Sequence, residues 1–373
     1  MRVLLDVSAV PARPVGAGVY TIQIAGRLAV HPDVDLVLVT RTDDADRWSH
    51  LAPGAELLPE VPTRRPSRLL WEQRTAPGLA RRVGADLWHG PHYTMPLRIE
   101  VPNVVTIHDL TFFDHPEWHE RSKVTFFRRM IRAAVRRANG LICVSDHTAR
   151  RLEAVLHPSA PVTVAAHGVD HDRFTPEGDA AADREVLART GIAEPYVAFV
   201  GTIEPRKDVP SLVRAFAALA DAHPGLRLVL AGADGWGARA VRDAVAASGH
   251  TTRILRPGYL PGETLAPLLR RAAVVAYPSL EEGFGLPALE ALACGAPVVT
   301  TSGSAMADVC GDAARLVPPG RPDLLAATLA AVLDDPGETD RLRAAGPVRA
   351  AGFTWEAAVE AHLRAYRLAI GVR

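Results

Sequence analysis

Residues 276–301, with the sequence AYPSLEEGFGLPALEALACGAPVVTT, restrict the fold of this chain more than any other segment. A short apolar run predicts a buried strand, and a glycine-rich loop follows it. A helix is expected from Pro287 to Cys294, because proline suits the first turn of a helix and glycine suits the position after the last. A strand, a glycine loop and a helix together present backbone N–H groups to an anion. With carboxylates at Glu282 and Glu290 beside the loop, the segment predicts a phosphorylated ligand that also carries hydroxyl groups.

The totals of the sequence indicate an ordinary globular protein. A length of 373 residues is enough for two domains, each with its own core. The formal net charge is zero, so the overall charge does not favour a nucleic-acid partner. The three cysteines lie far apart and show neither a disulfide framework nor metal-binding spacing. Because the apolar runs are too short for a signal peptide or a membrane span, we expect a cytoplasmic protein.

The chain begins with a predicted strand at residues 2–7, a loop that contains Gly16 and Gly18, and a helix to about Val30. A dinucleotide fingerprint would need a third glycine where Thr21 stands, which disfavours an NAD site. Two glycines before a helix still allow a phosphate or a sugar to approach the backbone closely.

Histidines near predicted strands are the next candidates in the first half. His108 and Asp109 follow the strongly β-prone run 104–107, and residues just past a strand's carboxyl end point into the ligand crevice of an open α/β sheet. The alternative is a structural His–Asp pair. For His89 and His92 we expect loop residues that line a cleft or face solvent, rather than metal ligands.

Residues 121–137 predict a basic amphipathic helix, because the apolar side chains recur at helical spacing and arginines fill the other side. Such a helix binds an anionic membrane surface or, more often, packs its apolar stripe on the sheet and solvates its charges. We favour packing, and keep peripheral contact with the inner membrane surface as the alternative.

The second half starts another α/β run with a strand at residues 196–200, after an interdomain connection expected within 172–183. Arg206 and Lys207 end the loop 201–207, at the start of a helix expected from about Val209 to Ala222, where the macrodipole favours anions. A bound anion would resolve this conflict, and an arginine fork with a lysine point charge suits a diphosphate. An exposed basic loop is the alternative.

With these loops in view, nearly the whole chain resembles the retaining nucleotide-sugar glycosyltransferases of family four, which have the GT-B fold. The motifs that carry the resemblance are GAGVY at 16–20, HDL at 108–110, VSDHTARRL at 144–152, HGVD at 167–170, VGTIEPRKD at 200–208, LVLAGADGWG at 228–237, GYLP at 258–261 and EEGFGLPALEALACGAPVV at 281–299. HGPHYTMP and HDLTFFDHPEWH look most like the bacterial mannosyltransferase-type members.

The resemblance implies two Rossmann-like α/β domains facing each other across a cleft. The acceptor domain is expected at residues 1–175 with the C-terminal helix 354–371 crossing back to it, and the nucleotide-sugar donor domain at 185–350. The implied reaction moves a hexose from a nucleotide sugar. Our first choice is mannose from GDP-mannose, with UDP- and dTDP-sugars as alternative donors. The acceptor is a hydroxyl of a glycan, a lipid-linked or a small-molecule acceptor, and neither a cofactor nor a metal is implied.

The same resemblance assigns roles residue by residue. Arg206 and Lys207 match the pair that neutralises the diphosphate, Glu282 the residue that contacts the transferred sugar, Glu290 the residue that binds the ribose, and His108 the cleft histidine. The other implied donor-binding residues are Gly16, Gly18, Asp109, Gly201, Thr202, Tyr259, Gly283, Phe284, Gly285 and Leu286. Thr202 departs from many members, in which an arginine follows the Val-Gly pair.

Two rival classes share parts of this pattern. Metal-dependent glycosyltransferases use an Asp-x-Asp motif, which occurs at 33–35, 44–46 and 170–172 but never after a suitable glycine-flanked strand. A nucleotide-sugar epimerase of similar architecture would convert the free donor without an acceptor. An inactive nucleotide-sugar-binding or membrane scaffolding protein would have little reason to keep the two cations and the two glutamates.

Overall fold

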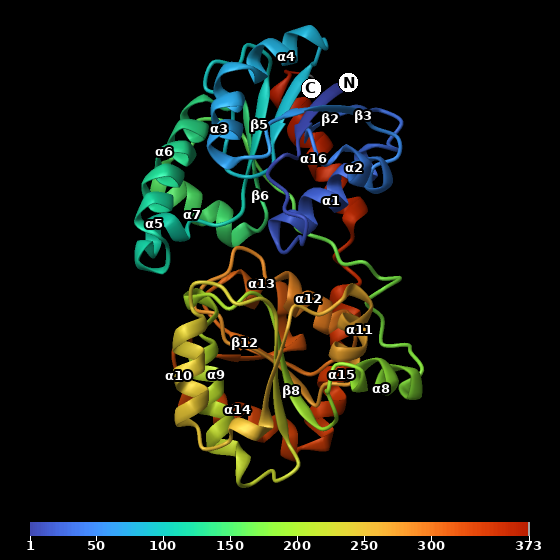
Figure 1. The fold of residues 1–373 in the computed structure, drawn as a ribbon, viewed down its shortest axis with the longest axis vertical. Coiled ribbons are helices and arrows are strands. Elements are labelled where there is room, and N and C mark those ends of the chain that lie inside the picture. The colour runs from blue at the N-terminus through green and yellow to red at the C-terminus, as the bar shows by residue number, and fades with distance from the viewer. Residues whose placement is uncertain (372–373) are drawn as a thin grey trace. The chain divides into compact units, whose positions relative to one another are not determined.

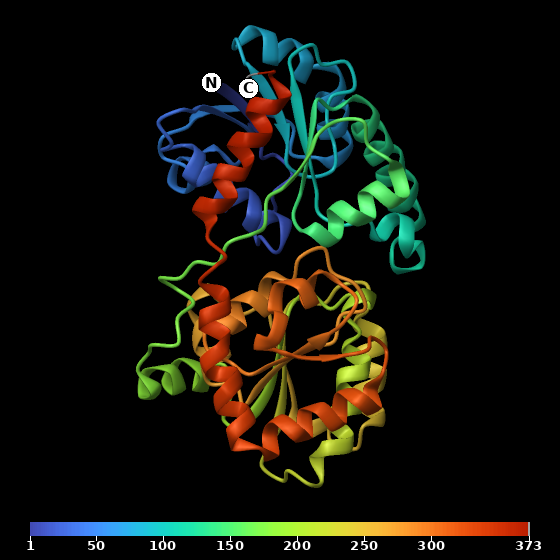
Figure 2. The ribbon, with the colours of Figure 1, turned by 180° about the vertical axis from the view of Figure 1, so that it is seen from behind.

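The computed structural model describes residues 1–371, which form two compact units. The first unit contains residues 1–168 and the C-terminal segment from Trp355, and the second contains residues 169–354. Each unit is a parallel sheet with helices on both faces (Figures 1 and 2). No helix within 1–371 is both long and apolar enough to span a bilayer.

The first unit is built on a seven-stranded parallel sheet in the order β3-β2-β1-β4-β5-β6-β7. Its strands are β1 (Arg2–Asp6), β2 (Asp35–Arg41), β3 (Glu56–Val61), β4 (Leu87–Gly90), β5 (Asn103–Ile107), β6 (Gly140–Cys143) and β7 (Val162–Val164). Its helices are α1 (Ala17–Leu28), α2 (Ala45–Leu51), α3 (Arg65–Arg74), α4 (Ala76–Arg82), α5 (Thr111–Asp114), α6 (Arg121–Arg137), α7 (Asp146–Leu156) and α16 (Trp355–Ala369), with a 3-10 turn at Pro116–Trp118.

Apolar side chains on both faces explain why this sheet is covered twice, as parallel sheets generally are. Helices α3, α4, α6 and α7 pack on one face. On the other face α16 runs along β5, β6 and β7 and touches α1 (Figure 2). The C-terminal helix therefore completes the core of the first unit.

The second unit has a six-stranded parallel sheet in the order β10-β9-β8-β11-β12-β13. Its strands are β8 (Tyr196–Val200), β9 (Arg227–Ala231), β10 (Ile254–Gly258), β11 (Val274–Tyr277), β12 (Val298–Thr301) and β13 (Arg315–Val317). Its helices are α8 (Ala180–Ala188), α9 (Val209–Ala220), α10 (Ala238–Ala247), α11 (Gly262–Arg270), α12 (Leu286–Ala293), α13 (Ala305–Cys310), α14 (Pro322–Asp334) and α15 (Pro336–Ala350), with 3-10 turns at Pro205–Lys207, Thr251–Arg253 and Gly311–Ala313.

Each sheet has one point where the order of strands reverses. In the first sheet the chain moves outward from β1 to β3 and then returns to the other side of β1 with β4, and in the second sheet β8 and β11 are the corresponding pair. Ligands of open α/β sheets bind beyond the carboxyl ends of the strands at such a switch point. The fold thus marks one candidate binding place in each unit.

The division between the units comes earlier than residues 172–183, where the sequence predicted the connection. Val169 already donates to the carbonyl of Phe353, at 3.1 Å, and Arg173 donates through Nη2 to the carbonyl of Gly262, at 2.7 Å. Asp183 accepts two hydrogen bonds from Arg270 and is buried. These contacts bind the unpatterned stretch into the second unit.

Candidate active site

The glycine loop expected from the sequence lies between β11 and α12, at the switch point of the second sheet. Gly285 adopts φ 97°, and a Cβ built there would approach Cγ of Met306 to 2.5 Å, so only glycine fits without displacement. α12 begins at Leu286 with Pro287 in its first turn, and Gly295 follows it in a positive-φ conformation. The predicted strand, loop and helix are confirmed.

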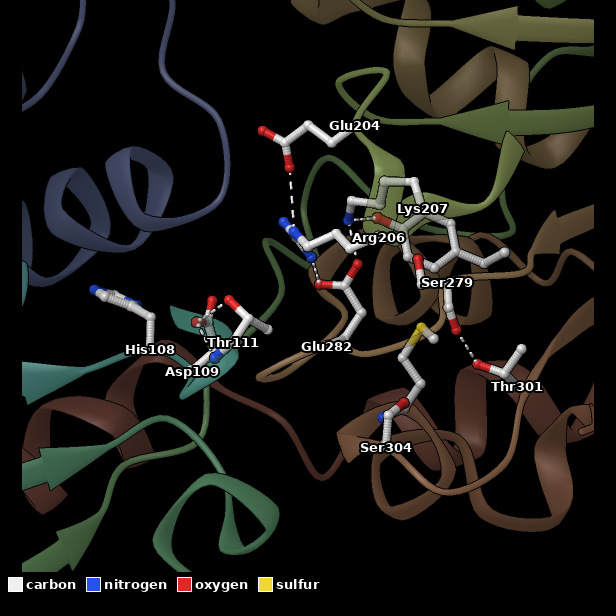
Figure 3. Close-up of polar contacts among 12 residues, drawn as sticks. His108, Asp109, Thr111, Glu204, Arg206, Lys207, Ser279, Glu282, Thr301 and Ser304 are labelled. Carbon is white, nitrogen blue, oxygen red and sulfur yellow. Dashed lines mark hydrogen bonds and ion pairs between the residues drawn. The ribbon is translucent and has the colours of Figure 1, made fainter. Parts of the chain in front are cut away.

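Arg206 and Lys207 converge on Glu282 (Figure 3). Nη1 of Arg206 lies 2.5 Å from Oε2 of Glu282, and Nζ of Lys207 pairs with the other carboxylate oxygen. Lys207 also donates to the hydroxyl of Tyr277, and Nε of Arg206 lies 3.1 Å from Glu204. The lysine and Glu282 are each 6% exposed, so this ion-pair cluster is shielded from solvent.

The two cations lie in the loop just before α9, which begins at Val209 as the sequence predicted. They occupy a 3-10 turn, and Asp208 at φ 45° separates that turn from α9. The charge of the cations beside this helix start is balanced by Glu282 and, for Arg206, also by Glu204. Both cations lie in the loop after β8, beside the switch point of the sheet.

The charges in this cluster shift one another's pKa. Burial alone would raise the pKa of Glu282, but Arg206 and then Lys207 outweigh it, and the carboxyl is held ionised with a lowered pKa. Burial and the nearby Arg206 lower the pKa of Lys207, while Glu282 opposes that shift. The result is a preformed, largely buried cluster in which Glu282 and Glu204 balance the two cations.

The second glutamate has a different environment. Glu290 lies on α12, and burial raises its pKa to about 7, with Arg173 opposing the shift and Asp170 adding to it.

Gly201, at φ 154°, lies in the loop after β8 with Thr202, and a Cβ on Gly232 would meet the carbonyl oxygen of Gly201 at 2.0 Å.

The other predicted residues of this unit differ in exposure. Gly283, Phe284 and Leu286 are buried around the start of α12. Tyr259, which follows β10, is 42% exposed.

In the first unit, His108 directly follows β5 and is 8% exposed. Its Nε2 lies 2.7 Å from the carbonyl oxygen of Pro91. Asp109 accepts hydrogen bonds from the backbone and hydroxyl of Thr111 (Figure 3). Within residues 1–371, His108 and Asp109 therefore do not form the hydrogen-bonded pair that was the alternative. Burial lowers the pKa of His108, which favours the neutral imidazole at neutral pH.

Gly16 and Gly18 mark the start of α1. Gly16 is the N-cap, at φ 45°. Gly18 lies in the first turn of the helix, where a Cβ would come within 3.1 Å of Cβ of Pro14. A side chain at either position would strain or crowd this loop.

A buried polar network in the first unit was missed by sequence reasoning. The hydroxyl of Tyr20 lies 2.8 Å from the Thr106 hydroxyl and 2.6 Å from Nε2 of His362. His89 lies 2.8 Å from Thr106 through Nε2 and 2.7 Å from the Tyr366 hydroxyl through Nδ1. His89 is fully buried within β4, so the expectation of a cleft-lining or solvent-facing loop residue is wrong for it. The network ties α16 to β4, β5 and α1.

This network makes stability dependent on pH. Burial lowers the pKa of His362 to about 4, so the unfolded chain binds the proton more readily than the folded chain. Above pH ~6.5 the buried His362 therefore does not lower the free energy of unfolding. Below that pH it lowers the free energy of unfolding by about 1.4 kcal/mol per pH unit, down to the folded pKa. Glu72 in the same unit has a raised pKa, about 8, and acts in the opposite direction, so a difference between two proteins is the appropriate measure.

We expect His362→Gln to be less acid-sensitive than the wild type, by about 3 kcal/mol on going from pH 7 to pH 4. Urea unfolding followed by tryptophan fluorescence measures this difference, because five of the six tryptophans lie in the first unit. His50→Gln, the same change at an exposed histidine of α2, is the control. Parallel stability–pH curves for the wild type and His362→Gln would contradict the assignment.

The residues 1–371 contain no group of three or more histidine, cysteine, aspartate or glutamate side chains placed to hold a metal ion. The three cysteines are buried and unpaired by disulfides. The positive charge near the glycine loop comes from the chain itself.

Comparisons with known proteins agree with this arrangement. The model described as Glycosyltransferase Family 4 matches residues 14–173, and the model described as Glycosyl transferases group 1 matches residues 185–349. The chain is 34% identical to a D-inositol 3-phosphate glycosyltransferase of Actinosynnema mirum, over 94% of this chain and 91% of that protein. The chain belongs to glycosyltransferase family 4.

A second relative and a solved structure extend the likeness over the whole length. The O-antigen chain mannosyltransferase B of Escherichia coli is 27% identical, over 99% of this chain and all of that protein. The HepE protein of Anabaena, in complex with UDP-glucose, has a similar fold with a TM-score of 0.78 at 18% identity, over 96% of this chain and 97% of that chain. This family 4 glycosyltransferase has the GT-B fold.

Proposed function

We propose that this glycosyltransferase moves a hexosyl group from a nucleotide diphosphate sugar to a hydroxyl of a glycan, a lipid-linked or a small-molecule acceptor, with retention and without metal. The observation that carries the proposal is the buried cluster of Arg206, Lys207 and Glu282 beside the start of α12. A largely buried pair of cations and a helix N-terminus at a switch point suit a diphosphate.

In the proposed reaction the bond between the anomeric carbon and the diphosphate oxygen breaks, and its electron pair stays on the phosphate. The acceptor hydroxyl forms the new bond from the same face of the sugar and gives its proton to the departing phosphate. Arg206 and Lys207 stabilise the charge that develops there, which is the largest catalytic effect expected. In this role Arg206 and Lys207 contact the diphosphate as well as Glu282. The oxygens of Glu282 then accept hydrogen bonds from the sugar.

The remaining predicted residues complete the donor site in this proposal. Glu290 binds the ribose hydroxyls, and the backbone of Gly283, Phe284 and Gly285 donates to phosphate and sugar. A hydrogen on Nε2 of His108 would bond to the carbonyl of Pro91 and leave Nδ1 as an acceptor for a sugar hydroxyl. Gly16, Gly18, Asp109, Gly201, Thr202, Tyr259 and Leu286 stay donor-binding predictions.

Mannose from GDP-mannose is our first choice of donor. The Escherichia coli relative is a mannosyltransferase, which supports mannose as the sugar. The UDP-glucose bound to HepE supports a uridine nucleotide as the alternative.

Peripheral contact with the inner membrane surface also stays a prediction. Arg121, Arg129 and Arg136 are exposed on α6 and supply charge, whereas its apolar side is buried in the first unit.

We expect transfer to persist in excess EDTA, because the charge that neutralises the diphosphate comes from side chains. The experiment offers GDP-mannose, UDP-glucose and dTDP-glucose to the chelated enzyme with methyl α-D-mannopyranoside and myo-inositol as acceptors, and follows donor and product by NMR. Loss of transfer on chelation that Mn²⁺ restores would refute the metal-free reaction. Conversion of a donor without any acceptor would indicate an epimerase, and donor binding without turnover an inactive binding protein.

A further inference from the structure

Lysine is rare in this chain, and one of its two lysines lies at the proposed donor site. Among the 42 lysine and arginine residues of the sequence, only Lys123 and Lys207 are lysines. Lys123 lies on α6 with a side chain that is 41% exposed, whereas Lys207 is buried in the second unit. The groups around the buried ammonium group of Lys207 therefore decide its position and its charge.

The side chain of Tyr277 is held from several directions. Tyr277 is the last residue of β11 and is fully buried. Its ring stacks on the ring of Phe199 in β8, with ring centroids 5.5 Å apart and an angle of 15° between the planes. Its backbone carbonyl accepts a hydrogen bond from the hydroxyl of Thr300 at 2.9 Å. A Cβ on Gly201 would lie 3.5 Å from its hydroxyl oxygen, so the loop after β8 covers the end of the ring.

The hydroxyl of Tyr277 needs a polar partner, because a buried hydroxyl without a hydrogen bond destabilises the fold. Lys207 is that partner, since its Nζ donates to the hydroxyl oxygen and lies 4.7 Å from the centroid of the ring. A phenylalanine would satisfy the apolar packing alone, as Phe199 does on β8. The oxygen atom of Tyr277 thus serves the lysine rather than the core.

Two oxygen atoms fix the direction of the Lys207 ammonium group. Within residues 1–371, Nζ donates to the hydroxyl of Tyr277 and to Oε1 of Glu282 (Figure 3). An ammonium group has three hydrogens, so one is left for a ligand, in a direction that the other two bonds determine. A charge that is already oriented is the most effective at a leaving group, because the reaction then requires no reorientation.

The same hydroxyl supports the charge of Lys207. Burial and then Arg206 lower the pKa of Lys207 to about 8, while the charges of Glu282 and Glu204 oppose that shift. A hydroxyl that accepts a hydrogen bond from the ammonium form favours that form as well. Burial and then the charge of Glu282 raise the pKa of Tyr277 well above its ordinary value, so the hydroxyl stays protonated and serves as an acceptor for Lys207.

We propose that Tyr277 is a positioning residue, whose hydroxyl holds the Lys207 ammonium group in the orientation and the charge state that bind a diphosphate. Tyr277 acts through Lys207 and does not itself touch the reacting atoms. The effect on Lys207 stands on the contacts described above, whereas the effect on turnover rests on the proposed function.

The scarcity of lysine makes a direct test possible. Protein labelled with ¹³C at the lysine ε position should give two NMR signals, and Lys123→Arg identifies the one that belongs to Lys207. Titration of that signal measures the pKa of Lys207 without any donor. Tyr277→Phe, which removes one oxygen atom and keeps the ring, should lower this pKa by about one unit, because the ammonium form loses a hydrogen bond.

Tyr196→Phe is the matched control. Tyr196 is the first residue of β8, is fully buried, and donates to the carbonyl oxygen of Leu268 at 2.8 Å. The variant loses a buried hydroxyl in the same sheet, at the opposite end of the strand from the loop that carries Lys207, so the pKa of Lys207 should not change. The proposal is overturned if Lys207 has the same pKa in the wild type and in folded Tyr277→Phe, or if both variants shift it equally.

The wild type offers a second test that does not need Tyr277→Phe to fold. With ring-labelled tyrosine, its spectrum should show nuclear Overhauser contacts between the ε hydrogens of Lys207 and the ring hydrogens of a tyrosine. A spectrum without these contacts overturns the proposal as well.

Turnover connects this role to the proposed function. Tyr277→Phe should lower kcat about tenfold with a smaller change in KM, whereas Tyr196→Phe should keep the kcat of the wild type. In the Lys207→Met background, Tyr277→Phe should cause no further loss, because a residue that acts through Lys207 has no effect without it. Independent losses in the two variants overturn the proposal. A wild type that neither turns over nor binds a free nucleoside diphosphate overturns only the proposed function, since the titration of Lys207 needs no donor.

Discussion

Replacing Lys207 by methionine is expected to lower kcat about 100-fold, because the variant loses one preorganised charge at the leaving diphosphate. Methionine is long, unbranched and apolar, so it fills the space that Nζ and its stem occupy under Tyr277. The affinity for the nucleoside diphosphate should fall as well. Initial rates with the preferred donor and calorimetric titration with the free nucleoside diphosphate measure both effects.

The fold should survive this substitution, since Arg206 still pairs with Glu282. A partner remains for the buried carboxylate, and we expect the melting temperature to fall by less than about 10 °C. Arg239→Met is the matched control, because this arginine of the second unit has a side chain that is 89% exposed. A folded Lys207→Met protein with the control's turnover would remove Lys207 from the catalytic site.

Local patterns in the sequence are sufficient to predict much of the second unit. Pro287 and Gly295 delimit α12, and apolar runs mark the strands on either side, because helix ends and buried strands depend on neighbours in the chain. The same reasoning placed His108 just after β5.

Pairings between distant residues were beyond that reasoning. Lys207 meets Tyr277 and Glu282 from more than sixty positions away in the chain, and Tyr277 looked only like the apolar end of a strand. The contact between Tyr20 and His362 joins the first and last helices. Polar residues inside otherwise apolar strands, such as His89 and Thr106, were the available signal, because a buried polar group needs a partner.

The ion pair between Lys207 and Glu282 changes the effect that we expect from a mutation of the glutamate. In the structure Glu282 is the counter-ion of both cations, so a diphosphate and this carboxylate compete for the same positive charge. Removing the charge of Glu282 should therefore lower turnover without weakening the binding of the nucleoside diphosphate. Loss of a residue that only contacts the sugar would not free the two cations in this way.

Glu282→Gln is expected to lower kcat at least about 100-fold while the affinity for the free nucleoside diphosphate is kept or increased. The amide no longer balances two buried cations, and loss of one partner of a buried ion pair costs about 3–5 kcal/mol of stability. The nucleoside diphosphate supplies the missing negative charge, so it should raise the melting temperature of Glu282→Gln more than that of the wild type. Glu263→Gln, at an exposed position on α11, is the control for both measurements. Weaker nucleoside diphosphate binding in Glu282→Gln than in the wild type would contradict this prediction. It would show that Glu282 does not compete with the diphosphate for Arg206 and Lys207.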